Sequence, residues 1–353
     1  MKKIRFTLAM MALVLCSLTV NAQYYTFEVD GICYRLTSRL MQTVSVTYRA
    51  DTCEKYAGDI VIPTIITYKG SEYKVSGITE GAFSGCSELL SITIPDEIQR
   101  IGDSAFKGCI KLTTISIPVG VPSIGVSMFE DCGRLESIYI PNSVTSIGAS
   151  AFAYCSGLDS ITIPNSITSI DVNAFSNCHG LKSFIVPASV TSIGEMAFFN
   201  CSRLESLKVA EGNAVFDSRY NCNAIIRTAS NTLIAACPTT VIPHDITTIG
   251  PKAFRGMSIT NLVFPDGLKA IGSLAFWGSS CDKTLIIPES VESIGQGAFT
   301  YCTADSVIIC GQLTSLEEAV FEGCSNLIYI DLPSSLESVN AKSFNGSINL
   351  QKI

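Results

Sequence analysis

The chain has 353 residues, a formal net charge of -7, 47% hydrophobic and 16% charged residues, 15 cysteines and two histidines. So many apolar residues exclude a disordered chain. The acidic balance argues against a nucleic-acid-binding protein, which needs Lys and Arg to neutralise phosphates. Two histidines leave little room for imidazole catalysis or a His-rich metal site, so composition points away from an enzyme.

The first 22 residues have the layout of a secretory signal peptide. A cationic start precedes the apolar run 6–20, and Ala22 stands at the expected cut before Gln23. A membrane anchor is an alternative, which the shortness of the run and the lack of a stop-transfer pattern disfavour. A lipoprotein with Cys16 as the lipidated residue is another, which Leu15 directly before that cysteine disfavours. The sequence therefore predicts export, to the cell surface or the extracellular space.

Residues 23–77 form the next predicted region. Polar and apolar residues alternate in 26–34, 43–48 and 73–75, and Asp-Gly and Lys-Gly pairs provide turns between such stretches. This pattern is typical of β-hairpins. We expect these hairpins to cap the repeats that follow, because an uncovered end would expose unpaired backbone groups and apolar side chains.

A repeat of 22 or 23 residues fills residues 78–353. Phenylalanines recur at this spacing from Phe83 to Phe344, with one interruption, and the unit at 143–165 reads SVTSIGASAFAYCSGLDSITIPN. A fixed period of this length is typical of a solenoid, in which each unit buries its apolar face only against its neighbours. We count about twelve units.

Each unit is predicted to contain one short strand and one helical turn, which makes the fold mainly β. The spacing Leu158-x-x-Ile161-x-Ile163 turns one side of the strand inward. Glycine, Asn or Asp follows two positions after most of the repeated phenylalanines, which predicts a left-handed residue at the end of the turn. Tyr154 and Tyr301 occupy that position in two units, and we expect those units to close differently.

One unit, at 210–243, is enlarged, because the distance from Phe198 to Phe254 exceeds two periods by ten residues. Apolar runs flank a polar turn inside it, which predicts a hairpin. Cys222 and Cys237 stand on either side of that hairpin. A disulfide between them is a candidate, with two free thiols as the alternative.

The phrase Ile-Gly-x-x-Ala-Phe-x-x-Cys-x-x-Leu-x-x-Ile-x-Ile-Pro resembles the BspA-like leucine-rich repeat family of bacterial secreted and surface proteins. The resemblance covers residues 78–353, and the lead-in at 58–83 and the enlarged unit also resemble segments of that family. It implies a right-handed, curved leucine-rich-repeat solenoid at the cell surface or outside the cell. It also implies adhesion to host matrix proteins or to other cells.

Eight cysteines share one register of the repeat. Export favours disulfides, but an inward column suits free cysteine as a small buried hydrophobe, and parallel side chains are poorly placed for bridging. We therefore predict free thiols, without a catalytic or metal-binding role, since no His or carboxylate recurs beside them. These residues are Cys86, Cys109, Cys132, Cys155, Cys178, Cys201, Cys302 and Cys324.

The outward columns of the strands are the candidate ligand-binding surface, because the resemblance implies recognition through the concave sheet. The alternative is a solvated face of β-forming Ser and Thr. Exposed aromatic and aliphatic side chains in the column favour contact with a partner. The candidate residues are Thr93, Ser116, Tyr139, Thr162, Ile185 and Lys208, with Asp159 and Lys182 in an adjacent column.

The function predicted first is adhesin-like binding of host matrix or bacterial surface proteins. A glycan-binding accessory protein is an alternative, which the single Trp277 disfavours, and a structural spacer is another. We predict no enzyme, because the sequence lacks a Ser-His-Asp order, a recurrent acid pair and a phosphate-binding Gly loop. We also predict no cofactor, metal or nucleic acid. A monomer is expected, with a dimer through the C-terminal edge strand at Ile353 as the alternative.

Overall fold

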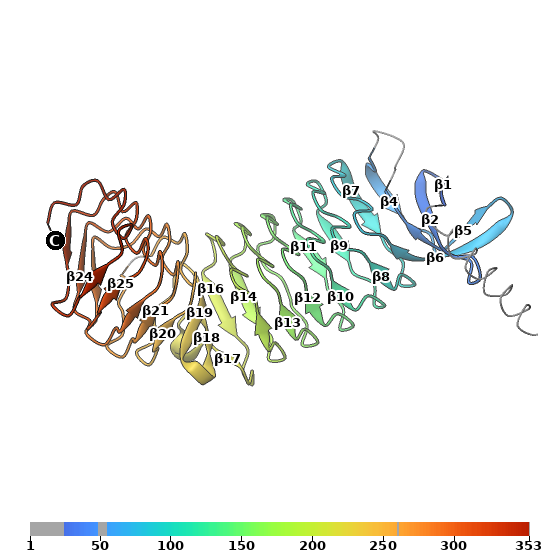
Figure 1. The fold of residues 1–353 in the computed structure, drawn as a ribbon. Coiled ribbons are helices and arrows are strands. Elements are labelled where there is room, and N and C mark those ends of the chain that lie inside the picture. The colour runs from blue at the N-terminus through green and yellow to red at the C-terminus, as the bar shows by residue number, and fades with distance from the viewer. Residues whose placement is uncertain (1–24, 49–54, 260, 353) are drawn as a thin grey trace, which may run out of the picture.

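The computed structural model describes residues 25–48, 55–259 and 261–352. The expected signal peptide, 1–22, lies outside these residues. The chain forms an elongated stack of rungs that begins at a small N-terminal sheet (Figure 1). The described residues form β-strands, turns and two short 3-10 helices, so the predicted solenoid is confirmed. No helix in the described residues is long and apolar enough to cross a bilayer.

The hairpins expected before the repeats form one sheet. Strands β1, β2 and β3 are antiparallel, and so are β5 and β6. Strand β6 pairs in parallel with β3 and with β8, so the cap is hydrogen-bonded directly to the solenoid. The strands of this cap sheet are β1 (Thr26–Val29), β2 (Ile32–Ser38), β3 (Thr43–Val46), β5 (Ile65–Tyr68) and β6 (Ser71–Ile78).

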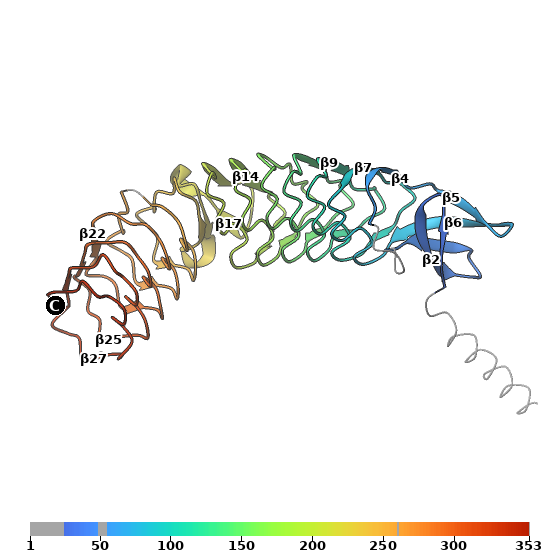
Figure 2. The same cartoon turned by 90° about the horizontal axis from the view of Figure 1, so that it is seen from above.

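Two ladders of parallel strands run along the solenoid (Figures 1 and 2). The first, called here the long-strand sheet, comes from the predicted strand of the repeat. Its strands are β4 (Gly58–Val61), β7 (Leu89–Thr93), β9 (Thr114–Ser116), β11 (Ser137–Tyr139), β14 (Ser183–Val186), β16 (Ser206–Val209), β22 (Thr284–Ile287), β24 (Ser306–Ile309) and β26 (Tyr329–Asp331).

The second ladder, the short-strand sheet, has two-residue strands around the Ser-Ile of the repeat. Successive units pair in exact repeat register, as in Ser146 with Ser169. The glycine that follows is required by close approach, because a Cβ on Gly148 would lie 2.9 Å from the carbonyl carbon of Gly125. These strands are β8 (Arg100–Ile101), β10 (Ser123–Ile124), β12 (Ser146–Ile147), β13 (Ser169–Ile170), β15 (Ser192–Ile193), β20 (Thr248–Ile249), β21 (Ala270–Ile271), β23 (Ser293–Ile294), β25 (Ser315–Leu316) and β27 (Ser338–Val339).

The third side of each rung, the turn edge, is a run of turns, and the helical turn expected there is not formed. The N–H of Phe106 donates to the carbonyl of Met128 in the next rung at 3.0 Å, and Gly108 donates to Glu130 at 2.7 Å. Ser104 and Gly108, on either side of Phe106, are left-handed, with φ 54° and 72°. The tyrosines expected to break this pattern follow it, since Tyr154 has φ 63° and Tyr301 has φ 58°.

Replacing Tyr154 with asparagine is expected to stabilise the protein by about 0.5–1 kcal/mol, because a left-handed backbone costs a bulky residue more than Asn. Tyr154 is half exposed, so little buried surface is lost. The next rungs carry Asn177 and Asn200 at this position, and the amide of Asn200 donates to Asn177 Oδ1 at 2.8 Å. Thermal denaturation checks this, with Tyr154→Val, which should lower the Tm, as the control. A lower Tm for Tyr154→Asn would contradict it.

The core is built on stacked phenylalanine rings. From Phe83 to Phe198, centroids in successive rungs lie 5.2–5.8 Å apart. A second stack runs from Phe254 to Phe344 with spacings of 4.9–5.8 Å. The enlarged unit separates the two stacks, and the buried apolar residues accordingly form two clusters.

The enlarged unit inserts a hairpin between these clusters, where the direction of the stack changes in Figure 1. Strand β18 has side chains in both cores, since Ile225 belongs to the first cluster and Ile226 to the second. Strand β19 then pairs in parallel with β20 and restarts the short-strand sheet. The elements of the unit are β17 (Phe216–Asp217), η1 (Arg219–Asn221), β18 (Ala224–Arg227), η2 (Thr228–Ser230) and β19 (Thr232–Ala236).

The candidate disulfide between Cys222 and Cys237 is not formed, and both residues are free thiols. The pairing register of β18 and β19 shifts by one residue between Ile225 and Ile226. One strand of the hairpin therefore has one more residue than the other between its turn and its open end. Because a shift of one residue reverses the face of a strand, Cys237 lies in the first core and Cys222 in the second. Without that bulge the two cysteines would occupy opposite positions in the register.

Candidate binding surface

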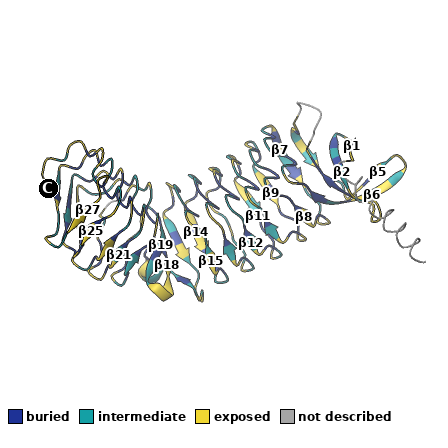
Figure 3. Ribbon diagram, in the orientation of Figure 1, coloured by how far each residue is buried: buried dark blue, intermediate teal, exposed yellow. Residues whose placement is uncertain are grey.

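The six residues predicted from the main outward column are all exposed, and five of them lie on strands of the long-strand sheet. Along β11 and β14, exposed and inward residues alternate (Figure 3). Tyr139 is 61% exposed and Ile185 59%, whereas Phe184 beside Ile185 is 1% exposed. Ser116 pairs with Tyr139, and Ile185 pairs with Lys208. The structure therefore brings these residues together in neighbouring pairs.

The remaining two members of the column are placed less regularly. Thr93 is exposed at the end of β7, which pairs with β4. Thr162 is exposed too, but its segment forms no regular strand, so the long-strand sheet is interrupted between β11 and β14. The column is consequently a row of equivalent positions rather than an uninterrupted ladder of hydrogen bonds.

The two charged candidates in the adjacent column form an ion pair. Lys182 Nζ lies 3.5 Å from Asp159 Oδ2, and their side chains are 53% and 63% exposed. A pair so exposed contributes about 0–1 kcal/mol at most. Similar pairs join consecutive rungs elsewhere, such as Lys111 with Glu88 at 2.6 Å. Asp159 and Lys182 therefore carry no net charge as a pair beside the column.

The structure adds apolar residues that the sequence reasoning missed. Val61 pairs with Thr93 and extends the column toward the cap. Val241, Val263 and Ile286 stand two positions before a proline, as Tyr139 and Ile185 do. They are 72%, 72% and 58% exposed. This shared position, two residues before a proline, is the signal in the sequence that identifies them.

The cysteine ladder has a structural role in the core. The Sγ of Cys155 donates a hydrogen bond to the backbone carbonyl of Phe129, in the preceding rung, at 3.1 Å. Cys109, Cys132, Cys178, Cys201 and Cys324 make the same bond to the preceding rung. Serine replaces cysteine in two rungs, where Ser279 and Ser347 donate at 2.7 Å. The column thus selects a small side chain that can donate one hydrogen bond.

Burial makes most of the ladder thiols unreactive. It raises the pKa of Cys132 and of Cys201 to about 12. Since the thiolate is the nucleophile and the metal ligand, these cysteines are inert at neutral pH. Among the described residues, no group of three or more His, Cys, Asp or Glu side chains could hold a metal ion.

Comparison with known proteins agrees with this architecture. The family model of the BspA-type leucine-rich repeat region matches residues 76–211 and 237–353, in six copies. The gap between the two matches falls within the enlarged unit. No curated protein matches the chain significantly.

Several solved structures have a similar fold. A leucine-rich cell surface protein from Faecalibacterium prausnitzii shares 22% identity, with a TM-score of 0.67 over 94% of each chain. A leucine-rich repeat protein from Bacteroides ovatus shares 25% identity, with a TM-score of 0.58 over 93% of this chain and 94% of that one. The pneumococcal vaccine antigen PcpA shares 20% identity, with a TM-score of 0.63 over 90% of this chain and 88% of its own. With its repeats matched over most of its length, the chain belongs to the BspA-type leucine-rich repeat family.

Proposed function

We propose that this chain is an adhesin-like surface protein that binds another protein through the outward column of the long-strand sheet. The observation that carries the proposal is the row of exposed apolar side chains at one position of the repeat. Val61, Tyr139, Ile185, Val241, Val263 and Ile286 are each 58–72% exposed. Scattered apolar residues are normal on a surface, but a row of them on one face is typical of an interaction site.

The family relationship supports the location of this activity. One structural relative is described as a cell surface protein and another as a vaccine antigen. Host matrix proteins or bacterial surface proteins are the partners we propose. Because Asp159 and Lys182 neutralise each other beside the column, binding should depend weakly on salt. A repeat solenoid is a scaffold for extended binding surfaces, so recognition rather than catalysis is the proposed activity.

The Ile185→Asp variant is expected to weaken binding to the partner at least tenfold, because it replaces an apolar contact in the centre of the row by a carboxylate that the partner would have to desolvate. Binding would be measured on immobilised fibronectin, fibrinogen and bacterial cells, with the chain lacking residues 1–22. The matched control is Val126→Asp, since Val126 is 46% exposed but lies on the turn edge. Equal binding by Ile185→Asp and the control would contradict the proposal.

A further inference from the structure

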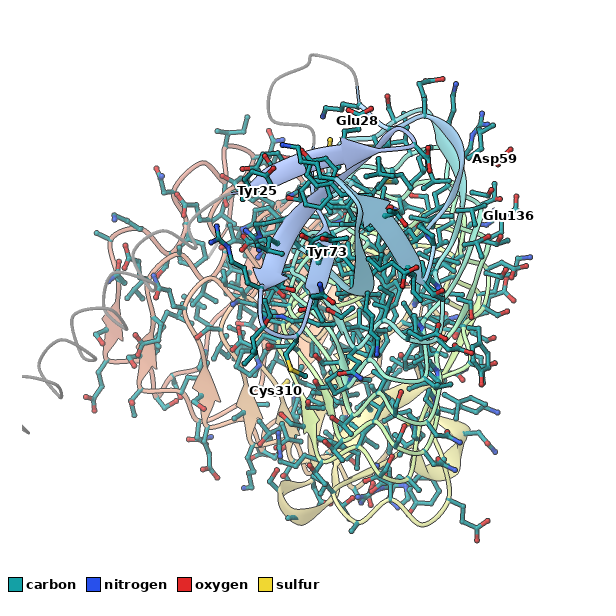
Figure 4. The ribbon with its side chains drawn as sticks, turned by 90° about the vertical axis from the view of Figure 1, so that its right-hand side faces the viewer. Tyr25, Glu28, Asp59, Tyr73, Glu136 and Cys310 are labelled. Carbon is teal, nitrogen blue, oxygen red and sulfur yellow. The ribbon has the colours of Figure 1, made fainter. Side chains whose placement is uncertain are left out.

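A cavity of about 310 Å³ opens at the N-terminal end of the molecule, in the cap sheet. In the end-on view of Figure 4, Tyr25 and Tyr73 lie on the cap sheet that faces the viewer. The cavity lies at the opposite end of the cap from the repeats and shares no residue with the outward column. It is lined by Tyr25, Phe27, Leu36, Arg39, Gln42 and Tyr73.

The walls of the cavity are held in place by the cap itself. Phe27 is 9% exposed and stacks on Tyr68 at 4.0 Å between ring centroids. The backbone N–H of Leu36 donates to the carbonyl of Tyr25 at 3.2 Å. Lys74, next to Tyr73 on β6, donates in the same way to Gln42 at 2.9 Å. The three strands that carry the lining are thus joined before any ligand arrives.

The polar side of the cavity comes from the turn between β2 and β3. Within this turn the N–H of Met41 donates to Ser38 Oγ at 3.0 Å, which fixes its course. Arg39 is the single charged side chain of the lining. In the described part of the chain it makes no ion pair, so its guanidinium is available. The Gln42 amide beside it can both donate and accept hydrogen bonds.

We propose that this cavity binds a sugar ring that carries a carboxylate, such as a terminal uronic acid. The volume is in the range of small-molecule sites and fits one or two pyranose rings. Tyr25 and Tyr73 offer apolar faces for the C–H side of a ring, and Gln42 offers partners for hydroxyls. The guanidinium of Arg39 matches a carboxylate in a two-bond geometry. A small inorganic anion would leave the aromatic walls unused.

The test is a titration of the full mature chain with methyl glucuronide and with methyl glucoside, followed by ligand-observed NMR. The acid should bind at least tenfold more tightly than the neutral sugar. Arg39→Gln should abolish that preference, and Tyr73→Ala should weaken both sugars. Lys208→Glu, on the long-strand sheet, should change neither. Equal binding of the two sugars, or an unchanged preference in Arg39→Gln at unchanged Tm, would overturn the proposal. Tighter binding of a peptide with a C-terminal leucine would also overturn it.

This site is independent of the proposed adhesin surface. Loss of the preference for the acidic sugar in Arg39→Gln with intact protein binding, and the reverse in Ile185→Asp, would separate the two. A glycan ligand does not require tryptophan here, because tyrosine and phenylalanine provide the aromatic faces of the cavity.

A different pair of residues supports a second inference, about oxidation. Cys302 belongs to the cysteine ladder, but its Sγ lies 3.2 Å from the Sγ of Cys281 rather than against a phenylalanine carbonyl. Cys281 is half-buried, two positions after Ser279, which occupies the ladder position in the preceding rung. The structure thus brings together two thiols of consecutive rungs, whereas Cys155 and Cys178 donate to backbone carbonyls.

We infer that Cys281 and Cys302 form a disulfide between consecutive rungs when the chain meets a disulfide oxidant. The thiolate of one cysteine attacks the external disulfide, forms a mixed disulfide with one half of it and releases the other half as a thiol. The thiolate of the second cysteine then attacks the mixed disulfide and releases the remaining half of the oxidant as a second thiol. The two cysteines lose two protons and two electrons, one S–S bond forms between them, and the oxidant is reduced to two thiols. The hydrogen bond between the two thiols lowers the pKa of Cys302, which favours a thiolate in this pair.

Oxidised glutathione would be added to the folded chain, followed by alkylation and peptide mass mapping. A cross-linked peptide pair containing Cys281 and Cys302 is expected, together with a higher Tm that a thiol reductant reverses. Cys281→Ser should abolish both effects, whereas Cys310→Ser should not, since Cys310 is exposed and outside the ladder (Figure 4). Separate alkylation of both thiols, or a Tm rise that persists in Cys281→Ser, would overturn the inference.

Discussion

Replacing Phe152 with alanine is expected to destabilise the folded protein by about 3–5 kcal/mol, because it leaves a cavity in the middle of the first ring stack. Phe152 is 0% exposed. Its ring lies 5.4 Å from Phe129 and 5.2 Å from Phe175, so the substitution removes two stacking partners at once. The rungs on either side cannot close the gap without breaking the hydrogen bonds between successive turns.

Urea denaturation measures this loss, and amide hydrogen exchange locates it. Since each rung contacts only its neighbours, exchange should accelerate most in the rungs around residue 152 and least beyond the enlarged unit. Thr162→Ala is the matched control, because Thr162 belongs to the same unit and is exposed. A midpoint for Phe152→Ala within error of that control would show that the column is not packed as described.

Stability is also expected to fall steeply above pH 9. Burial raises the pKa of Cys132, Cys201 and Cys324 to about 12 in the folded state, whereas an unfolded cysteine has a pKa of about 8.5. The folded chain therefore keeps protons that the unfolded chain loses. The contribution is complete below about pH 8.5 and is lost as the pH rises toward 12, at about 1.4 kcal/mol per pH unit for each thiol.

The free energy of unfolding would be measured from pH 8 to 11 for the wild type and for a Cys132→Ser, Cys201→Ser variant. Serine should fit, because Ser279 donates to the carbonyl of Phe254 from the same position. The variant should show a shallower decline, while ionisation of Tyr and Lys affects both proteins alike. Parallel curves for the two proteins would contradict the raised thiol pKa values.

The repeat spacing was enough to predict the solenoid, the inward columns and the outward face. Equivalent residues of successive units must lie above one another, so the repeat spacing alone predicts that residues such as Cys155 and Cys178 form a column. At the turn edge the left-handed residue was predicted correctly for the Gly, Asn and Asp units but wrongly denied to Tyr154 and Tyr301. Residue preference at Tyr154 disagrees with the hydrogen bonds between rungs, and those bonds decide the backbone. A preference of about 1 kcal/mol is too small to break a stack in which every neighbour has the same geometry.

The hairpin of the enlarged unit shows a second limit of sequence reasoning. Spacing placed Cys222 opposite Cys237, but a bulge in the register moves them into different cores. No Gly or Pro in β18 or β19 marks that bulge in the sequence. The cavity in the cap was equally hidden, because Arg39 and Tyr73 are far apart in the sequence and meet only when β3 pairs with β6.

The parallel pairing of successive rungs determines how the protein responds to mechanical load. Its inter-strand hydrogen bonds run along the long axis of the stack, so tension between the two ends pulls on one layer of bonds at a time. A molecule built in this way peels open rung by rung, at low force, instead of resisting until it fails as a whole. Contact with a moving surface would therefore lengthen the protein gradually, and released rungs could re-form on the template of their intact neighbours.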